Sequence, residues 1–226
     1  MIMHLRTFHS IRITIPLLLA IVLLTAARGV QAVNIKGEVM AKPAAVAHFN
    51  LTDQDGKPFT QQKLKGKWSL LYFGFTSCTT MCPVNLLQLS KFYLQLKSNG
   101  VTAGEMPQVL FISVDPARDT PAKMKTYVHH YNPDFIGLTG TEKQIKTLES
   151  FCSTQHQANT ALNGQYQVKH SALVYLVNPK QQLVASFYPP FYIDGLVKDY
   201  LAVIDSETPT VSLNQHGAST PQLPSI

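Results

Sequence analysis

Residues 70–83 read Leu70-Leu-Tyr-Phe-Gly74-Phe-Thr-Ser-Cys78-Thr-Thr-Met-Cys82-Pro83. The apolar, aromatic first half is typical of a buried strand, and the second half delivers two cysteines to what we expect to be the first turn of a helix. Residues i and i+4 share one face of a helix, with Cβ atoms about 5–6 Å apart. Two sulfurs so placed can close a disulfide or share one soft metal ion. The positive end of the helix should also favour their thiolate forms.

The segments outward from this motif alternate between strands and helices. Residues 153–166 are polar and without pattern, which predicts a loop. The order of the other elements is that of a thioredoxin-like α/β fold, a mixed central sheet flanked by helices, with an N-terminal hairpin and the thiols at the end of a central strand. The patterns predict hairpins over 49–59 and 172–188, strands over 68–75, 108–114 and 135–138, and helices over 83–98, 120–131, 142–152 and 193–204.

The N-terminal residues resemble a targeting segment. Arg6 and Arg12 precede an uncharged apolar run over 13–27, and Val30-Gln31-Ala32 supplies the small residues of a cleavage site. As a helix this run would span about 22 Å, less than the roughly 30 Å hydrocarbon core of a bilayer. We predict a secretory signal peptide over residues 1–32, with an uncleaved membrane anchor as the alternative. Either one places the folded part in the periplasm.

The rest of the chain is long enough for one domain. We expect a linker over 33–44, a thioredoxin-like domain over 45–205 and a disordered tail over 206–226, where Ser, Thr, Pro, Gln and Gly dominate. The whole chain has a formal charge of +6, and part of it belongs to the arginines of residues 1–32. The remainder has no run of Lys and Arg, so we expect no binding to nucleic acid.

Three cysteines are too few for a disulfide scaffold. Cys152 has apolar neighbours and is expected to be a buried thiol. A role as a resolving or auxiliary thiol is the alternative.

His170 decides between a simple redox pair and a metal site. It precedes the strand predicted to begin near residue 172. In a thioredoxin-like topology the loop before that strand lies against the turn that carries the two cysteines, which we call the cysteine turn. A neutral imidazole there would complete a set of two sulfurs and one nitrogen. Such soft ligands favour Cu(I), or Cu(II) with additional ligands, whereas zinc usually takes four. Cys78, Cys82 and His170 are therefore the candidate copper ligands.

The acidic segment after the second predicted strand allows two interpretations. Asp115 is expected to form a turn with Pro116, while Asp119 or Thr120 caps the following helix and Arg118 pairs with either acid. Alternatively, Asp115 orients a group of the site or meets a partner. Met81 is expected to be an exposed residue of the turn, with a transient thioether contact to copper as the alternative.

Over roughly residues 45–205 the chain resembles the Sco/SenC family of copper-binding assembly factors for cytochrome c oxidase. The resemblance implies that Cys78, Cys82 and His170 bind one copper ion and that the two cysteines cycle between dithiol and disulfide. It also implies a recipient, the copper site of oxidase subunit II. Lys169 departs from the pattern, since many relatives have an acidic residue there, and Cys152 is not part of it. The matching segments are Asp53–Gly56, Phe73–Pro83, Ser113–Pro121 and His170-Ser171.

These observations favour a copper chaperone, a metal carrier rather than a turnover enzyme. It would deliver copper to cytochrome c oxidase subunit II or to another copper or dithiol protein, with a possible association with the inner membrane through the N-terminus. The alternative is a thiol–disulfide oxidoreductase that keeps the recipient's cysteines reduced, because it needs the same thiol pair. A thiol peroxidase is a third, weaker hypothesis, since we cannot place the Arg and Thr that such a site requires.

Overall fold

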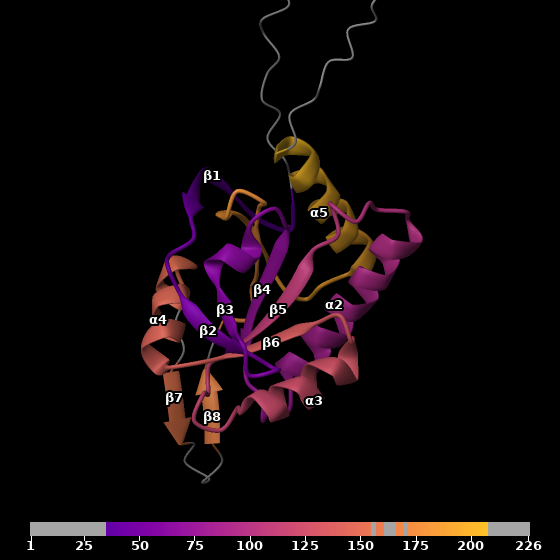
Figure 1. Ribbon diagram of the computed structural model, residues 1–226. Coiled ribbons are helices and arrows are strands. Elements are labelled where there is room, and N and C mark those ends of the chain that lie inside the picture. Colours follow the sequence, from indigo (N-terminus) through magenta and orange to yellow (C-terminus); the bar gives the residue numbers. More distant parts are fainter. Residues whose placement is uncertain (1–34, 155–156, 161–165, 170, 208–226) are drawn as a thin grey trace, which may run out of the picture. The chain divides into compact units, whose positions relative to one another are not determined.

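A mixed eight-stranded sheet forms the centre of the chain in the computed structural model (Figure 1). The structure describes residues 35–154, 157–160, 166–169 and 171–207. The predicted mixed sheet, flanking helices and N-terminal hairpin are confirmed. In spatial order the strands are β1 (Gly37–Ala45), β10 (Gln182–Phe187), β9 (Val174–Val177), β4 (Ser69–Gly74), β5 (Gln108–Ser113), β6 (Ile136–Thr139), β2 (Asn50–Asp53) and β3 (Pro58–Thr60).

Strand β4 lies between a parallel and an antiparallel neighbour. It pairs in parallel with β5, from Ser69 opposite Gln108 to Gly74 opposite Ser113. On its other side it pairs with β9, where Tyr72 faces Val174 in antiparallel register. All six residues of β4 are buried, as expected for an apolar run covered on both faces. The carboxyl ends of β4 and β5 and the start of β9 therefore meet at one edge of the sheet.

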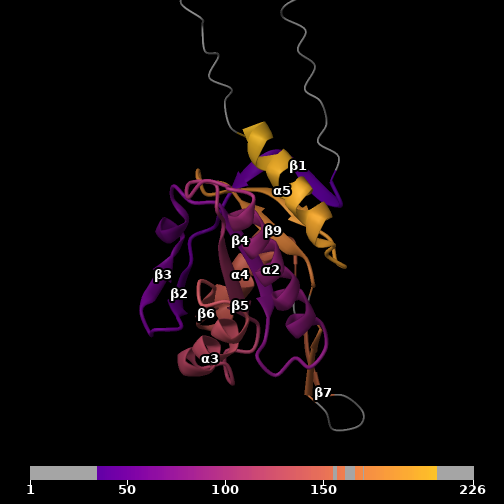
Figure 2. The ribbon, with the colours of Figure 1, turned by 90° about the vertical axis from the view of Figure 1, so that its right-hand side faces the viewer.

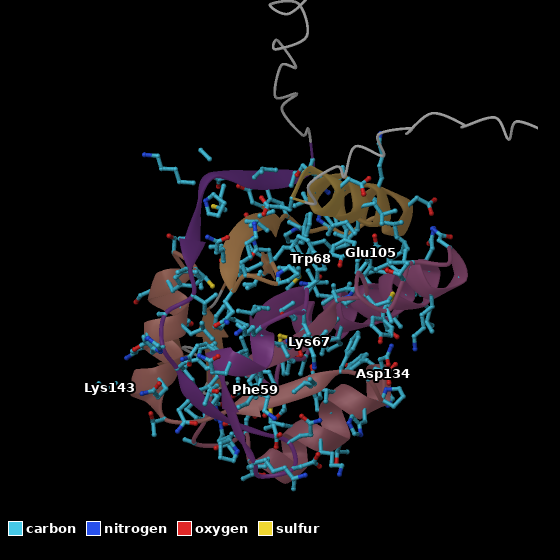
Figure 3. All side chains as sticks on the ribbon, turned by 45° about the horizontal axis from the view of Figure 1, so that its top comes forward. Phe59, Lys67, Trp68, Glu105, Asp134 and Lys143 are labelled. Atoms are coloured by element: carbon cyan, nitrogen blue, oxygen red, sulfur yellow. The ribbon has the colours of Figure 1, made fainter. Side chains whose placement is uncertain are left out.

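Helices cover both faces of the sheet (Figures 1 and 2). One face packs against α2 (Met81–Ser98), α3 (Pro121–Tyr131) and α5 (Ile193–Glu207). The other face packs against α4 (Glu142–Phe151) and the short 3-10 helix η1 (Gln61–Leu64). The side chains of Trp68 and Glu105 lie next to α5 (Figure 3). There Tyr200 of α5 meets the Trp68 ring edge-on at 6.4 Å, and its hydroxyl donates to the Glu105 carbonyl.

The main difference from the prediction is β1, which occupies most of the expected linker over 33–44. It pairs with β10, from Gly37 opposite Phe187 to Ala45 opposite Gln182. None of its residues is fully buried, so no alternation of apolar and polar residues marks it in the sequence. The position of β1 in the sheet depends on backbone hydrogen bonds to β10, which is more than 130 residues further along the chain.

Two smaller differences concern segments that we expected to be irregular. The predicted loop over 153–166 contains strand β7 (Gln157–Thr160). It pairs with β8 (Tyr166–Lys169), which begins where that loop was expected to end, and the two strands extend away from the main sheet (Figures 1 and 2). Helix α5 continues to Glu207, just past the expected start of the tail. The predicted signal peptide and the rest of the tail lie outside the described residues. Within those residues, no helix is long and apolar enough to span a membrane.

Gly37 tests whether β1 belongs to the sheet. A Cβ atom at this position would lie 1.9 Å from the carbonyl oxygen of Ser186 on β10. Gly37→Ala must push the strands apart, and we expect the free energy of unfolding to fall by about 1–3 kcal/mol, as in other overpacked sites. Urea denaturation followed by circular dichroism measures the change. The control is Gly104→Ala, where a Cβ atom meets nothing within 4 Å; an equal response of both variants would refute this pairing.

Candidate metal and redox site

The two cysteines lie on either side of the start of α2. Strand β4 ends at Gly74, and a tight turn follows in which the Cys78 N–H donates to the Phe75 carbonyl at 3.2 Å. Helix α2 begins at Met81, so Cys82 is its second residue. The expectation that both thiols stand on the first helical turn is therefore wrong for Cys78. It lies in the turn before the helix because the chain must first reverse from the end of the strand.

The two thiols differ in exposure. Cys82 is fully buried, whereas Cys78 is partly exposed and packs against the core clusters on both faces of the sheet. Neither forms a disulfide in this structure. A reactant or a protein partner can therefore approach Cys78, whereas Cys82 has no exposed surface.

Gly74 permits the close approach of Cys82 to the end of β4. A Cβ atom at this position would lie 2.4 Å from Cε2 of Phe111 and 2.9 Å from the Cys82 sulfur. Both distances are too short for any side chain to fit without a shift. The glycine at the centre of the sequence motif therefore leaves the space in which the sulfur and the Phe111 ring lie.

The pKa of the Cys82 thiol is raised above its ordinary value. The hydrogen bond with Cys78 contributes most, followed by burial and by the negative charge that Cys78 would carry. The expected stabilisation of the thiolate by the helix N-terminus therefore does not bring the pKa of Cys82 below its ordinary value. A helix dipole contributes only about 0.3–1 kcal/mol at most sites, which burial and a neighbouring sulfur outweigh. The two sulfurs form a coupled pair that gives up its second proton with difficulty.

The Asp119 carboxylate links the cysteine turn to β5 through hydrogen bonds. Its carboxylate has no exposed surface and accepts hydrogen bonds from the Thr76 N–H at 3.1 Å, the Thr76 hydroxyl at 2.5 Å and the Ser113 hydroxyl at 2.6 Å. Thr76 is two residues before Cys78. The sequence predicts that Asp119 or Thr120 caps α3. The cap is Thr120, whose hydroxyl accepts from the Lys123 N–H at 3.4 Å. Thr120 and Pro121 already form a complete start for α3. The acidic residue directly before them was therefore the sequence feature that could have indicated another role for Asp119.

Asp115 builds the loop that carries Asp119. Its carbonyl accepts from the N–H groups of Arg118 and Asp119, each at 3.0 Å. Its side chain, 5% exposed, accepts from Nε of Arg118 at 2.7 Å. The predicted turn and the predicted local pairing of Arg118 are therefore confirmed.

His170 lies outside the described residues, so the structure does not test its position. The described residues that follow it lead into β9 at the edge where β4 ends, since Val174 faces Tyr72. The Ser171 hydroxyl accepts from the Leu173 N–H at 3.2 Å in this segment. Within the described part of the chain, no group of three or more His, Cys, Asp and Glu residues is placed to hold a metal ion. That part supplies two sulfurs, which suit a soft ion.

The other candidates lie close to where the sequence predicted them. Cys152 is buried in the core cluster that includes Leu148, and burial, followed by the charge of Glu149, raises the pKa of its thiol. Met81 is 45% exposed, as predicted, but it is the first residue of α2 and not part of the turn. Val84 and Leu87, further along α2, are also exposed.

The fold and the site together define a thioredoxin-like protein that carries a Cys-x-x-x-Cys pair at the end of a central strand. A family model described as SCO1/SenC matches residues 38–204. The chain belongs to this family.

Comparisons with single proteins agree with this assignment. Mitochondrial SCO2 of Saccharomyces cerevisiae is 41% identical over 156 residues, which cover 67% of this chain and 47% of that protein. The structure of Arabidopsis thaliana ScoI with copper bound is 34% identical, with a TM-score of 0.66, and the match covers 72% of this chain and 99% of that one. Yeast Sco1 with copper bound is 33% identical, also with a TM-score of 0.66, over 74% of this chain and 92% of that one. The chain spans about half the length of the yeast SCO2 protein.

Asp119→Asn tests the attachment of the cysteine turn. The amide cannot accept all three hydrogen bonds, and hydrogen bonds to charged groups contribute about 1.5–3 kcal/mol each. We expect the free energy of unfolding to fall by about 2–4 kcal/mol and hydrogen exchange of the Thr76 amide to accelerate. Asp134→Asn is the control, since Asp134 forms an exposed ion pair with Lys97 at 2.9 Å of the kind that contributes about 1 kcal/mol or less. An Asp119 variant as stable as the Asp134 variant would contradict the assigned role.

The raised pKa values predict that the reduced protein loses stability in alkali. The folded chain keeps Cys82 and Cys152 protonated above pH 9.0, the ordinary pKa of a thiol, where the unfolded chain releases these protons. The unfolded state then binds fewer protons, so stability is constant below about pH 8 and falls as the pH rises above 9, by at most about 1.4 kcal/mol per pH unit for each thiol. Urea unfolding under reducing conditions from pH 7 to 10.5 measures the slope. Cys152→Ala should make the slope shallower, and a stability that rises with pH would contradict the buried, protonated thiols.

Proposed function

We propose that this protein is a copper chaperone that holds one copper ion through Cys78, Cys82 and His170. The observation that carries the proposal is the pairing of a partly exposed sulfur, Cys78, with a fully buried one, Cys82, at the end of β4. Two relatives that are 33–34% identical have been solved with copper bound, which supports copper as the ion carried by this chain. Soft thiolate ligands are consistent with that choice.

Chain connectivity supports the third ligand. Val174 is four positions after His170, which limits the distance between their Cα atoms to about 14 Å. Val174 in turn faces Tyr72, two residues before the end of β4. An imidazole within this reach of the cysteine turn would complete a set of two sulfurs and one nitrogen.

The exposure of the two sulfurs suggests how copper is handed over. Copper displaces the proton of Cys82 when it binds, so affinity for the ion should rise with pH. A ligand of the recipient can approach the ion from the side of Cys78 and replace the Cys78 sulfur first. The Cys82 sulfur stays bound to copper until a second ligand of the recipient replaces it. The recipient that we propose is the copper site of cytochrome c oxidase subunit II, or another copper or dithiol protein.

The second candidate function is that of a thiol–disulfide oxidoreductase. The Cys78 thiolate would attack a partner disulfide to form a mixed disulfide, and Cys82 would then attack the sulfur of Cys78 and release the reduced partner. Two electrons pass to the partner, and this chain ends as the disulfide. The arrangement of one accessible and one buried thiol favours this candidate as well.

The position of the protein in the cell is a further part of the proposal. The basic and apolar composition of residues 1–32 supports export, with cleavage after Ala32 or retention as an anchor of the inner membrane. In both cases the domain over 45–205, together with β1, would face the periplasm.

His170→Ala separates the two functions. We expect the affinity for copper to fall by at least about 100-fold, because even residues that merely support a ligand contribute 10–100-fold. The rate at which the reduced protein reduces a disulfide-bonded peptide should stay within about twofold. Equilibrium dialysis against a copper chelator and a thiol-release assay measure the two quantities.

The matched control is His130→Ala, which removes an exposed histidine of α3 and should change neither quantity. Unchanged copper affinity in the His170 variant would overturn the three-ligand site. Loss of disulfide reduction with intact copper binding would instead assign His170 to thiol chemistry.

A further inference from the structure

The loop between β10 and α5 exposes two tyrosines. Tyr192 is the most exposed of the large apolar and aromatic side chains among the described residues, at 70%, and Tyr188 is 40% exposed. Together with Pro190 and Leu196 they line a mostly apolar hollow of about 40 Å³. Exposed surfaces of this kind are sites of contact with another protein or with a membrane. The loop is therefore a candidate interaction surface.

Lys36, just before β1, holds this loop in place. Its N–H donates to Oδ2 of Asp199 on α5 at 2.9 Å. Its Nζ donates to the carbonyl of Pro190 at 2.6 Å and lies 4.8 Å from the centre of the Tyr192 ring. The N–H of Tyr188 donates to the carbonyl of Lys36 at 3.1 Å. These contacts attach the loop to the start of β1, which lies beside α5 (Figure 2), so the two tyrosine rings stand on a fixed support.

The chemistry of the surface suits the headgroup region of a bilayer. Tyrosine combines an apolar ring with a polar hydroxyl, and lysine combines an apolar stem with a charged end, so both side chains settle where apolar and aqueous phases meet. Tyrosine is enriched at membrane interfaces for this reason. The carboxylate of Asp199 lies close to Lys36, so the surface has little net charge. It therefore matches zwitterionic phospholipids and has no excess charge that would select an acidic or a basic protein.

The length of the N-terminal segment brings a membrane within reach of this surface. The apolar run that could anchor the chain ends at Ala27, and Ile35, which packs against the core cluster that includes α5, is eight positions later. Even fully extended, this segment spans at most about 28 Å. A chain retained by its anchor therefore keeps the tyrosines at a high effective concentration next to the bilayer. Among possible occupants of the surface, the bilayer is the one that the chain itself supplies.

The register of the sheet places this surface on the same edge as the cysteine turn. Phe187, the last residue of β10, faces Val174 of β9, which in turn faces Tyr72 near the end of β4. Neighbouring strands lie about 4.8 Å apart, so the start of the tyrosine loop is about 10 Å from the strand that leads into the cysteine turn. A bilayer in contact with the tyrosines would thus face the edge at which Cys78 is exposed.

We propose that Lys36, Tyr188 and Tyr192 form a membrane-contact surface, which places this edge of the domain on a phospholipid bilayer with the cysteine turn directed toward the lipid headgroups. This inference rests on the retention of residues 1–32 as an anchor, which is one of the two cases of the proposed function, and not on copper. It implies that Cys78 meets its partners close to the membrane.

The first test measures contact between the surface and lipid. The full, uncleaved chain is reconstituted in phosphatidylcholine vesicles in which some headgroups carry a nitroxide that quenches fluorescence. Side chains at an interface lie about 5–10 Å deep in the headgroup region, so quenching of the added fluorescence should be at least about twofold stronger in Tyr192→Trp than in the control. The control is Lys143→Trp, an exposed position of α4 on the other face of the sheet (Figure 3). Trp68, the one native tryptophan, is buried and gives both variants the same background.

The second test measures the direction of the cysteine edge in the reduced apoprotein. A pyridyl disulfide is attached to a lipid headgroup. The Cys78 thiolate attacks the lipid-side sulfur, the S–S bond breaks, and pyridine-2-thione leaves with the electron pair and takes up a proton. Its absorbance gives the rate, which is divided by the rate with a soluble pyridyl disulfide. The double variant Tyr188→Ser, Tyr192→Ser should lower this ratio at least about threefold, because Cys78 loses the effective concentration that contact with the bilayer provides; the rate with the soluble reagent should not change.

The outcomes separate this inference from the proposed function. Flotation of the vesicles shows whether the chain is anchored; if it is not, the anchored case of the proposed function fails, and the quenching of Tyr192→Trp by added vesicles still decides on the surface. Quenching of Tyr192→Trp that is no stronger than that of Lys143→Trp overturns the membrane contact. If the double variant then also reduces a soluble disulfide-bonded peptide more slowly, the surface belongs to a protein partner instead. Strong quenching with an unchanged rate ratio would overturn the orientation of the cysteine edge.

Discussion

The buried carboxylate of Asp119 holds the cysteine turn to the sheet. It accepts hydrogen bonds from Thr76 in that turn and from Ser113 at the end of β5. These groups can meet because β4 and β5 run in parallel and end side by side. Without this attachment, a turn that links an apolar strand to a helix would have several ways to place its two sulfurs, and the distance between them would not be fixed.

The attachment has a chemical consequence, because it places one sulfur inside the core and one at its edge. Gly74 leaves the space for Cys82, and Cys78 lies where the two core clusters meet the surface. An ion bound between them would be shielded on one side and accessible on the other, as a carrier requires. The same asymmetry serves thiol exchange, so a single arrangement supports both candidate functions.

The sequence predicted best what is decided locally. The buried run of β4, the helix after Pro83 and the Thr-Pro start of α3 follow from neighbouring residues, and all are present. Strand β1 was missed because almost no side chain of it is buried, and the role of Asp119 because Thr76 is 43 residues away from it. The raised pKa of Cys82 was missed because it depends on tertiary burial and on Cys78. The ligand role of His170 stays a prediction.

The direct test of the site is copper K-edge X-ray absorption on the full chain loaded with one equivalent of Cu(I). The account predicts two sulfur neighbours and one nitrogen neighbour, with the multiple-scattering pattern of an imidazole ring. A spectrum with a single sulfur neighbour, or with two sulfurs and no imidazole, would contradict a site built from Cys78, Cys82 and His170.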